Sequence, residues 1–207
     1  MDHEVSIQPR GRITPQEYLE LERRAETRSE YIDGEAYLMS GASREHTQIA
    51  ANLTIELGLQ FKDKPCELYP LEMRTKVSST GLYTYPDIAA VCGEPLFEDS
   101  HFDTLLNPTL IIEVLSESTE SYDRGKKFAH YRNLPSLREY VLVSQWEYRI
   151  ERFFRTEDGS WLYTESTAPD GSMELTSVGA RLTLSSVYAK VDLERARRRR
   201  ENPHNPA

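Results

Sequence analysis

Apolar residues recur at helical spacing in parts of this chain and at strand spacing in others. Between Arg44 and Phe61 they fall on one side of a helical projection, which predicts a long amphipathic helix. The positions on this stripe are Ile49, Leu53, Leu57 and Phe61. An earlier helix is predicted over residues 15 to about 27, because Thr14 and Glu17 form a capping-box pattern around Pro15. Two more helices are expected over residues 122–131 and 187 to about 199.

Strand-like segments alternate with these helices. Residues 29–33 and 35–39 flank Asp33 and Gly34, a pair typical of a two-residue hairpin turn. Further strands are expected over residues 66–77, 85–91, 109–115, 137–144, 148–154 and 161–166, with short strands between 172 and 184. Residues 78–84 are expected to form a turn, and the acidic segment 93–108 an exposed, mobile loop. This order predicts an α/β (α+β) fold with a mixed central sheet flanked by helices.

The length of the chain, 207 residues, fits a single domain. We expect a loosely attached segment over residues 1–12, a domain over 13–192 and a basic tail over 193–207. No apolar run approaches about 18 residues and the first residues are polar, so we expect a cytoplasmic protein with no membrane contact. Cys66 and Cys92 lack the spacing of a zinc site, and buried reduced cysteines are favoured over a disulfide.

The charge of the chain argues against tight, non-specific binding to nucleic acid. Its formal net charge is -9, and five arginines lie between Arg195 and Arg200. Removing those five positive charges leaves -14 on the rest of the chain. The arginine run is interpreted first as a solvated helix end or tail, although it could add weak affinity for phosphate.

A carboxylate stands inside the most apolar of the predicted strands. Residues 109–115 are β-branched or aliphatic apart from Glu113, as expected of a buried central strand. A charge there is unfavourable unless it is paired or coordinated. Glu113 is therefore either half of a buried ion pair or a metal-binding or catalytic carboxylate at the floor of a cleft. Asp87, embedded in another short apolar strand, is the candidate second acid.

The helix that follows Glu113 offers a lysine to the same place. Asp123, Lys127 and Tyr131 are spaced four residues apart and share a face. The apolar direction of this helix lies roughly 70° from Lys127 and roughly 170° from Lys126, so only Lys127 can lean toward the sheet. Its alternative is an ordinary helical salt bridge with Asp123.

These residues and their order resemble the Uma-two-type endonucleases, a family of the PD-(D/E)XK nuclease superfamily. The resemblance covers roughly residues 14–190 and implies a restriction-endonuclease-like fold. The segments that carry it are Glu30 to Glu35, His46, Tyr85 to Asp87, Glu113 to Ser116, Asp123, Lys127, Tyr131 and Glu139 to Val143.

The superfamily pattern implies that Asp87 and Glu113 bind Mg²⁺ or Mn²⁺, because these hard cations prefer oxygen ligands such as carboxylates. Its usual lysine would stand two residues after the second acid, but this chain has Leu115 there. In this family the lysine stands on the following helix, which makes Lys127 the candidate to orient the nucleophile or to stabilise charge on phosphorus.

Several other residues are candidates with plainer alternatives. His46 is either a site residue, a phosphate contact or a histidine near a helix cap. Glu35, and more weakly Glu30, would complete the acidic cluster or are acids beside a turn. Tyr131 packs in the core or contacts phosphate, and Asp123 orients Lys127 from one turn away.

The sequence thus predicts a metal-dependent endonuclease that hydrolyses phosphodiester bonds in DNA, with a homodimer expected from the superfamily. Two alternatives stay open. One is a nuclease-fold module that has lost catalysis and acts through protein contacts, and the other is a metal-dependent hydrolase of another phosphate ester.

Overall fold

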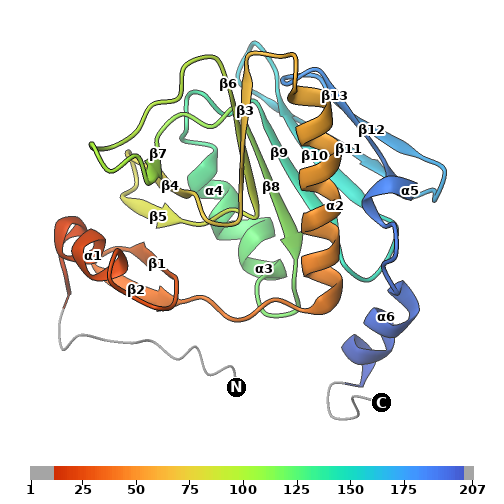
Figure 1. Ribbon diagram of the computed structural model, residues 1–207, viewed down its shortest axis with the longest axis horizontal. Coiled ribbons are helices and arrows are strands. Elements are labelled where there is room, and N and C mark those ends of the chain that lie inside the picture. Colours follow the sequence, from red (N-terminus) through yellow and green to blue (C-terminus); the bar gives the residue numbers. More distant parts are fainter. Residues whose placement is uncertain (1–11, 203–207) are drawn as a thin grey trace.

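The computed structural model describes residues 12–202, and its centre is a six-stranded mixed sheet in the order β11-β10-β9-β8-β6-β3 (Figure 1). These strands are β3 (Cys66–Pro70), β6 (Ile88–Cys92), β8 (Leu110–Leu115), β9 (Glu139–Ser144), β10 (Ile150–Arg155) and β11 (Trp161–Ser166). Neighbours are antiparallel except β8 and β9. The parallel pair needs a crossover, which α3 (Glu120–Tyr122), the π-helix η1 (Asp123–Lys127) and α4 (Phe128–Tyr131) supply.

Side chains that alternate along the strands build two cores, one on each face of the central sheet. Ile112 and Val114 of β8 pack with α2 (Arg44–Phe61), with the hairpin of β12 (Ser172–Leu175) and β13 (Ala180–Thr183), and with α5 (Leu184–Val187). Ile111 and Leu115 face the other way, toward Tyr131 of α4. Because neighbouring residues of a strand point to opposite faces, both faces of β8 must be apolar, and Glu113 lies on the α4 face.

A second sheet of five strands, in the order β2-β1-β5-β4-β7, closes the other side of α4. Its strands are β1 (Ser29–Ile32), β2 (Glu35–Leu38), β4 (Arg74–Val77), β5 (Leu82–Thr84) and β7 (Thr104–Leu105). Helix α1 (Pro15–Glu22) lies against it through Tyr18, which stacks on Tyr31 with 4.9 Å between ring centroids. The last helix, α6 (Leu193–Glu201), lies at the end of the molecule to which β8 points (Figure 1).

Local sequence signals predicted several elements correctly. The Thr14 side chain accepts a hydrogen bond from the Glu17 backbone, and Glu17 bonds back, so the capping box is present. Asp33 and Gly34 have φ of 52° and 88°, which is the backbone that a tight hairpin turn requires. The long helix spans Arg44–Phe61 as predicted. Residues 1–11, most of the segment expected to be loosely attached, lie outside the described residues.

Other boundaries were wrong because tertiary contacts divide the segments. Residues 66–77 form two strands in different sheets, separated by a turn in which Leu71 has φ of 58°. The expected turn 78–84 ends in strand β5, and the first helix stops at Glu22. The helix expected over 187–199 starts later, as α6 (Leu193–Glu201), and Val187 ends the short preceding helix α5.

The acidic segment 93–108 is not the exposed loop that its composition suggested. It contains β7, and its acids form ion pairs with basic side chains of distant elements. Arg23 lies 2.7 Å from both Asp99 and Asp103, and Lys76 pairs with Glu98. Partners this far away in sequence cannot be identified from local patterns.

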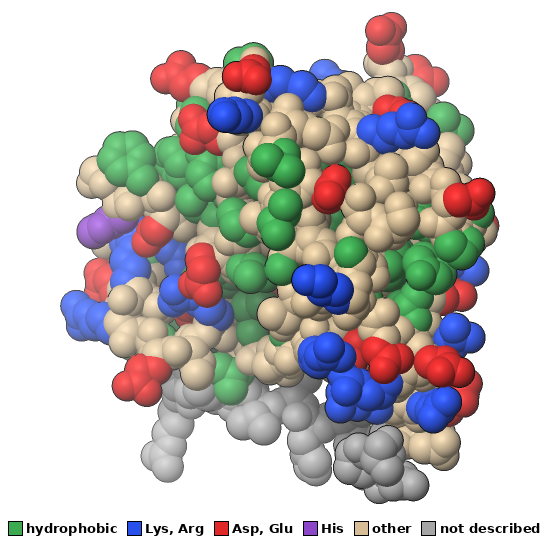
Figure 2. Space-filling model, turned by 45° about the vertical axis from the view of Figure 1, so that its right-hand side comes forward, with side chains coloured by type: hydrophobic (Ala, Val, Ile, Leu, Met, Phe, Trp, Pro, Cys, Tyr) green, Lys and Arg blue, Asp and Glu red, His purple; other side chains and the backbone are tan. Residues whose placement is uncertain are grey.

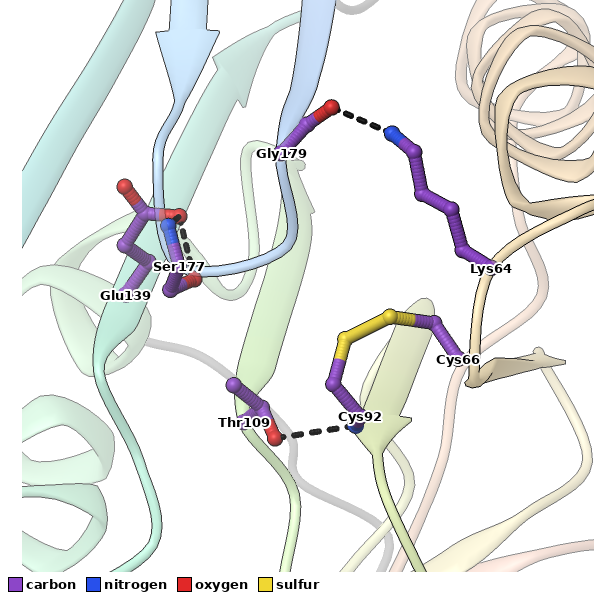
Figure 3. Close-up of a disulfide and its surroundings, with 7 residues drawn as sticks. All are labelled: Lys64, Cys66, Cys92, Thr109, Glu139, Ser177 and Gly179. Carbon is purple, nitrogen blue, oxygen red and sulfur yellow. Dashed lines mark hydrogen bonds between the residues drawn. A yellow bond between two sulfur atoms is a disulfide. The ribbon is translucent and has the colours of Figure 1, made fainter.

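The two cysteines form a disulfide, which corrects the prediction of reduced thiols (Figure 3). Strands β3 and β6 pair so that Cys66 stands directly opposite Cys92, with Cα atoms 4.0 Å apart. The backbone N–H of Cys92 also donates to the Thr109 hydroxyl at 3.1 Å. Sequence spacing carried no information on this strand register. Among residues 12–202 no helix has the length and apolar character needed to cross a membrane.

The disulfide is expected to stabilise the pairing of edge strand β3. It closes a loop with a sequence separation of 26, for which chain entropy gives about 3 kcal/mol of stabilisation. The Cys66→Ser/Cys92→Ser variant should therefore melt at a lower temperature than oxidised wild type, measured by circular dichroism. In dithiothreitol the two proteins should melt together. Titration of two free thiols in unfolded, unreduced wild type would contradict the pairing.

Candidate functional site

Glu113, in the fourth position of β8, is buried, and both of its carboxylate oxygens have polar neighbours. Its Oε1 lies 3.0 Å from Lys127 Nζ and accepts a hydrogen bond of 2.9 Å from the Tyr131 hydroxyl. Its Oε2 lies 3.4 Å from the backbone nitrogen of Asp87. The predicted meeting of the β8 acid with the helix lysine is therefore present in the structure, as a buried ion pair.

Lys127 reaches the sheet from the π-helix η1. Its side chain is 6% exposed, and its Nζ lies 3.0 Å from Glu30, 3.0 Å from Glu113 and 3.5 Å from Asp123. The wide turn of a π-helix is common at functional sites, and here both Asp123 and Lys127 are buried on its inner side. The neighbouring Lys126 is exposed, as the helical projection predicted.

The backbone carbonyl of Asp123 accepts a hydrogen bond of 3.0 Å from the Tyr140 hydroxyl. This bond ties η1 to β9. Tyr122, the residue before η1, has its ring centroid 6.0 Å from Lys127 Nζ.

Asp87 precedes β6 and meets the centre of β8 from the neighbouring strand. Its Oδ2 accepts a hydrogen bond of 2.7 Å from the backbone N–H of Val114 and lies 3.1 Å from His46 Nε2. Its Oδ1 has no hydrogen bond to any described residue. His46 is placed by the start of α2, where the Ser43 side chain accepts from the His46 backbone.

Negative charge exceeds positive charge in this cluster. The acids are Glu30, Asp87, Glu113 and Asp123, and the bases are Lys127 and His46. Burial raises the pKa of Glu113 well above its ordinary value, and Lys127 opposes this shift. Burial also raises the pKa of Asp123. A bound proton or an added cation would reduce the cost of burying these two negative charges.

The pKa values of the two bases are raised as well, although burial acts against their charged forms. Burial alone would lower the pKa of Lys127, but the charges of Glu113 and Glu30 outweigh burial and raise it well above its ordinary value. For His46, burial is likewise outweighed by the hydrogen bond and charge of Asp87, so its pKa is raised. Lys127 is therefore an ammonium ion throughout the neutral range.

The residues present fit a hard divalent cation with an open coordination sphere. The described residues contain no group of three or more His, Cys, Asp or Glu side chains arranged to enclose a metal. Mg²⁺, however, is commonly held by one or two carboxylates, with water and substrate phosphate completing its sphere. Asp87 and Glu113 are two such carboxylates, and the Asp87 Oδ1 atom is free to bind.

The structure separates the remaining candidates. Tyr131 is fully buried and bonded to Glu113, so it is part of the cluster as well as of the core. Glu35 starts β2, accepts a hydrogen bond of 2.6 Å from Tyr37, and forms no ion pair with Lys127. Glu30, the weaker candidate in sequence, lies 3.0 Å from Lys127 Nζ and also accepts a hydrogen bond from the Thr84 hydroxyl.

Comparison with known proteins identifies relatives over most of the chain. Residues 15–185 match the Uma2 family, which is described as "Putative restriction endonuclease". "Uncharacterized protein sll1609" of Synechocystis sp. (strain ATCC 27184 / PCC 6803 / Kazusa) is 37% identical over 162 residues, which are 78% of this chain and 92% of that protein. "Uncharacterized protein slr1290" of the same organism is 34% identical over 180 residues, 87% of this chain and 93% of that protein.

A solved structure shares the fold. It is described as "a putative nuclease belonging to DUF820" from Anabaena variabilis ATCC 29413, and it superposes with a TM-score of 0.71. The alignment covers 86% of this chain and 98% of the other, at 19% sequence identity. This likeness confirms the predicted fold class, a mixed α+β architecture of the nuclease type.

Replacing Lys127 by methionine should destabilise the protein in a pH-dependent way. Because the pKa of Lys127 is raised, its stabilising charge is fully present below the ordinary lysine pKa of about 10.4 and is lost only above it. Lys127→Met leaves Glu30, Glu113 and Asp123 without their cation, which should cost about 3–5 kcal/mol at pH 8 in urea unfolding. At pH 5 the loss should be smaller, because acids with raised pKa values take up protons.

Lys126→Met is the matched control, since it removes the same charge from an exposed neighbour. It should change the free energy of unfolding by no more than about 0.5 kcal/mol at either pH. Equal losses in the two variants, or a Lys127→Met loss that does not depend on pH, would contradict the ion cluster.

Proposed function

The chain belongs to the Uma2 family, described as "Putative restriction endonuclease", and on this premise we propose that it is a metal-dependent endonuclease that hydrolyses phosphodiester bonds in DNA. The observation that supports the proposal most is the convergence of Asp87 and Glu113 from adjacent strands beside the buried ammonium of Lys127. An acid pair with an excess of negative charge and one free carboxylate oxygen suits a divalent cation and its phosphate ligand.

Asp87 and Glu113 would hold the cation, Mg²⁺ or Mn²⁺. When bound, the cation would activate water and offset charge that develops on the phosphate. In the proposed site the protein's own contribution is position: the Val114 N–H and His46 fix the inner oxygen of Asp87, while Tyr131 and Lys127 fix Glu113. The free oxygen of Asp87 is proposed to bind the cation.

Lys127 is proposed to stabilise the additional negative charge of the transition state. Leu115, at the position where the superfamily pattern has lysine, lies on the same face of β8 as Glu113 but is fully buried among apolar residues. An ammonium at this apolar position would have to be desolvated. The η1 helix supplies one instead, and Asp123 orients it from the same helix.

A second candidate function, a nuclease-fold binding module without catalysis, is favoured by one observation. The Lys127 ammonium already has three carboxylate neighbours, so it is neutralised before any substrate arrives. Catalysis by Lys127 requires that a cation or phosphate displace part of this pairing. Hydrolysis of another phosphate ester would use the same groups and differ only in substrate shape.

We also propose that the protein acts in the cytoplasm as a homodimer. A two-fold pair of sites would cut both strands of a duplex, which is the simplest use of an isologous dimer by an endonuclease.

Metal binding tests the proposed site without knowledge of the substrate sequence. In calorimetric titrations with Mg²⁺ and Mn²⁺, wild type should release or absorb binding heat, and Asp87→Asn and Glu113→Gln should abolish it. Glu35→Gln is the control, because it removes an acid outside the cluster and should leave the heat unchanged. Binding that survives both site substitutions in folded protein would place the metal elsewhere.

Cleavage separates the enzyme from the binding module. With Mg²⁺ or Mn²⁺ and plasmid DNA, wild type should produce cuts, and Glu113→Gln should reduce the rate by about 10²-fold or more. Chelation of the metal should stop the reaction. A folded, metal-binding wild type that cuts neither DNA, RNA nor simple phosphodiesters would favour the module without catalysis.

A further inference from the structure

The arginine-rich segment is a helix packed on the body of the protein. The Asp192 side chain caps α6 by accepting from the Arg195 backbone at 2.9 Å, and Leu193 and Ala196 are buried. The run is thus a helix whose arginines are largely exposed, one of the two forms interpreted from the sequence, and its apolar side packs on the protein. The arginines of α6 are therefore displayed at a defined place on the surface.

One anchor of α6 is the beginning of α2. Arg195 lies 2.7 Å from the Glu45 carboxylate, and Arg199 lies 3.6 Å from it. Glu45 is only 1% exposed and directly precedes His46, which contacts Asp87 of the proposed site. The basic helix thus begins beside one of the segments that carry site residues.

The other anchor is α3. Arg200 lies 2.8 Å from Glu120 and 4.0 Å from the ring centroid of Trp146. Glu120 stands one helical turn before Asp123, which contacts Lys127. Helix α6 therefore bridges two segments that lead into the acidic cluster, and lies at its rim.

Two arginines of α6 form an ion pair with neither Glu45 nor Glu120. Arg197 forms no ion pair with any described residue and is exposed. Arg198 has only Glu194, at 3.5 Å, and the two side chains are 71% and 77% exposed, so this pair is weak. Figure 2 shows blue side chains gathered, with red ones among them, toward the lower right of the molecule.

A polyanion approaching the proposed site needs this charge. The cluster itself has more acids than bases, and the chain as a whole carries -9. Phosphates would be repelled there unless positive side chains stood at the rim. Arginine suits the task because its planar fork bonds phosphate oxygens in pairs.

We propose that α6 is a phosphate-binding element that holds the backbone of a nucleic acid at the rim of the site, through Arg197 and Arg198. This inference rests on the proposed function for the position of the substrate. Arg195, Arg199 and Arg200 fix the helix, and the two outward arginines bind the phosphates. Such contacts position the nucleic acid and carry no base sequence.

A simpler explanation is that α6 only links α2 to α3 and has no role in binding. It accounts for Arg195, Arg199 and Arg200 only. It requires the residues that meet Glu45 and Glu120, and it gives no role to Arg197 and Arg198. The two explanations therefore predict different effects for the outward pair.

The test compares two double variants with equal charge change. Arg197→Gln/Arg198→Gln removes the outward pair of α6. Arg138→Gln/Arg181→Gln is the matched control: Arg138 is exposed without an ion pair to any residue of 12–202, and Arg181 has an exposed partner at 3.2 Å, Glu174. Both control residues lie toward the other end of the molecule, at the start of β9 and beside the last turn of α2.

Binding is measured by fluorescence anisotropy in EDTA, so that no cleavage occurs, with labelled duplex DNA and single-stranded RNA of about 20 nucleotides. Wild type should bind at least one probe with an affinity that falls as salt rises. The α6 variant should bind about ten-fold more weakly, and its salt slope should fall by about 0.9 for each phosphate that its glutamines no longer neutralise. The control variant should bind like wild type, and both should melt at the wild-type temperature.

The outcomes separate this inference from the proposed enzyme activity. Unchanged binding by the α6 variant, an equal loss in the control variant, or no binding of either probe by wild type would overturn the inference. Selective loss in the α6 variant, in a protein that never cleaves with added metal, would support α6 as the phosphate-binding element and refute the nuclease instead. Binding of RNA alone would support α6 and refute DNA as the substrate.

Discussion

The burial of one ammonium ion among carboxylates is the interaction on which the rest of this structure depends. Lys127 meets acids from three different elements: Glu30 of β1, Glu113 of β8 and Asp123 of its own helix. A buried charge is tolerated only when its partners are held in place. The cluster therefore joins the five-stranded sheet, the central sheet and η1, and any opening between them would leave charges unpaired.

The surrounding fold supplies this rigidity from both faces of the sheet. On one face, α2 packs its buried stripe on β8 and presents His46 to Asp87. On the other, Tyr131 and Tyr140 fill the space beneath η1, each also bonded to a polar group of the site or of η1. Apolar packing and polar positioning thus use the same side chains. A site held in this way is organised before any ligand binds, which is the condition for stabilising charge in a transition state.

Acidic and basic side chains are concentrated in different parts of the molecule. Acids concentrate in the interior of the cluster, where they suit a cation, and the densest run of arginines is bound over its rim by Glu45 and Glu120. Acids of the segment 93–108 likewise form ion pairs beside the second sheet, with Arg23 and Lys76. Net charge alone argued against tight, non-specific binding to nucleic acid. Local charges matter more near a site, because the field there depends on the groups around it.

The sequence by itself determined the elements whose signals are local. The capping box at Thr14, the Asp33-Gly34 turn and the stripe of α2 all depend on contacts within a few residues, and the apolar run around Glu113 identified the central strand together with its exceptional acid. The choice of Lys127 over Lys126 followed from helical spacing in the same way.

Tertiary structure alone decided everything that depends on strand register and on partners far apart in the chain. It paired Cys66 with Cys92, divided residues 66–77 between two sheets, brought Glu30 to Lys127 and folded the arginine run onto Glu45. A register shift of one residue reverses the face of every side chain, yet leaves the composition and periodicity of a strand unchanged. The free energy that selects one register comes from burial and pairing across the whole core, and no local pattern records it.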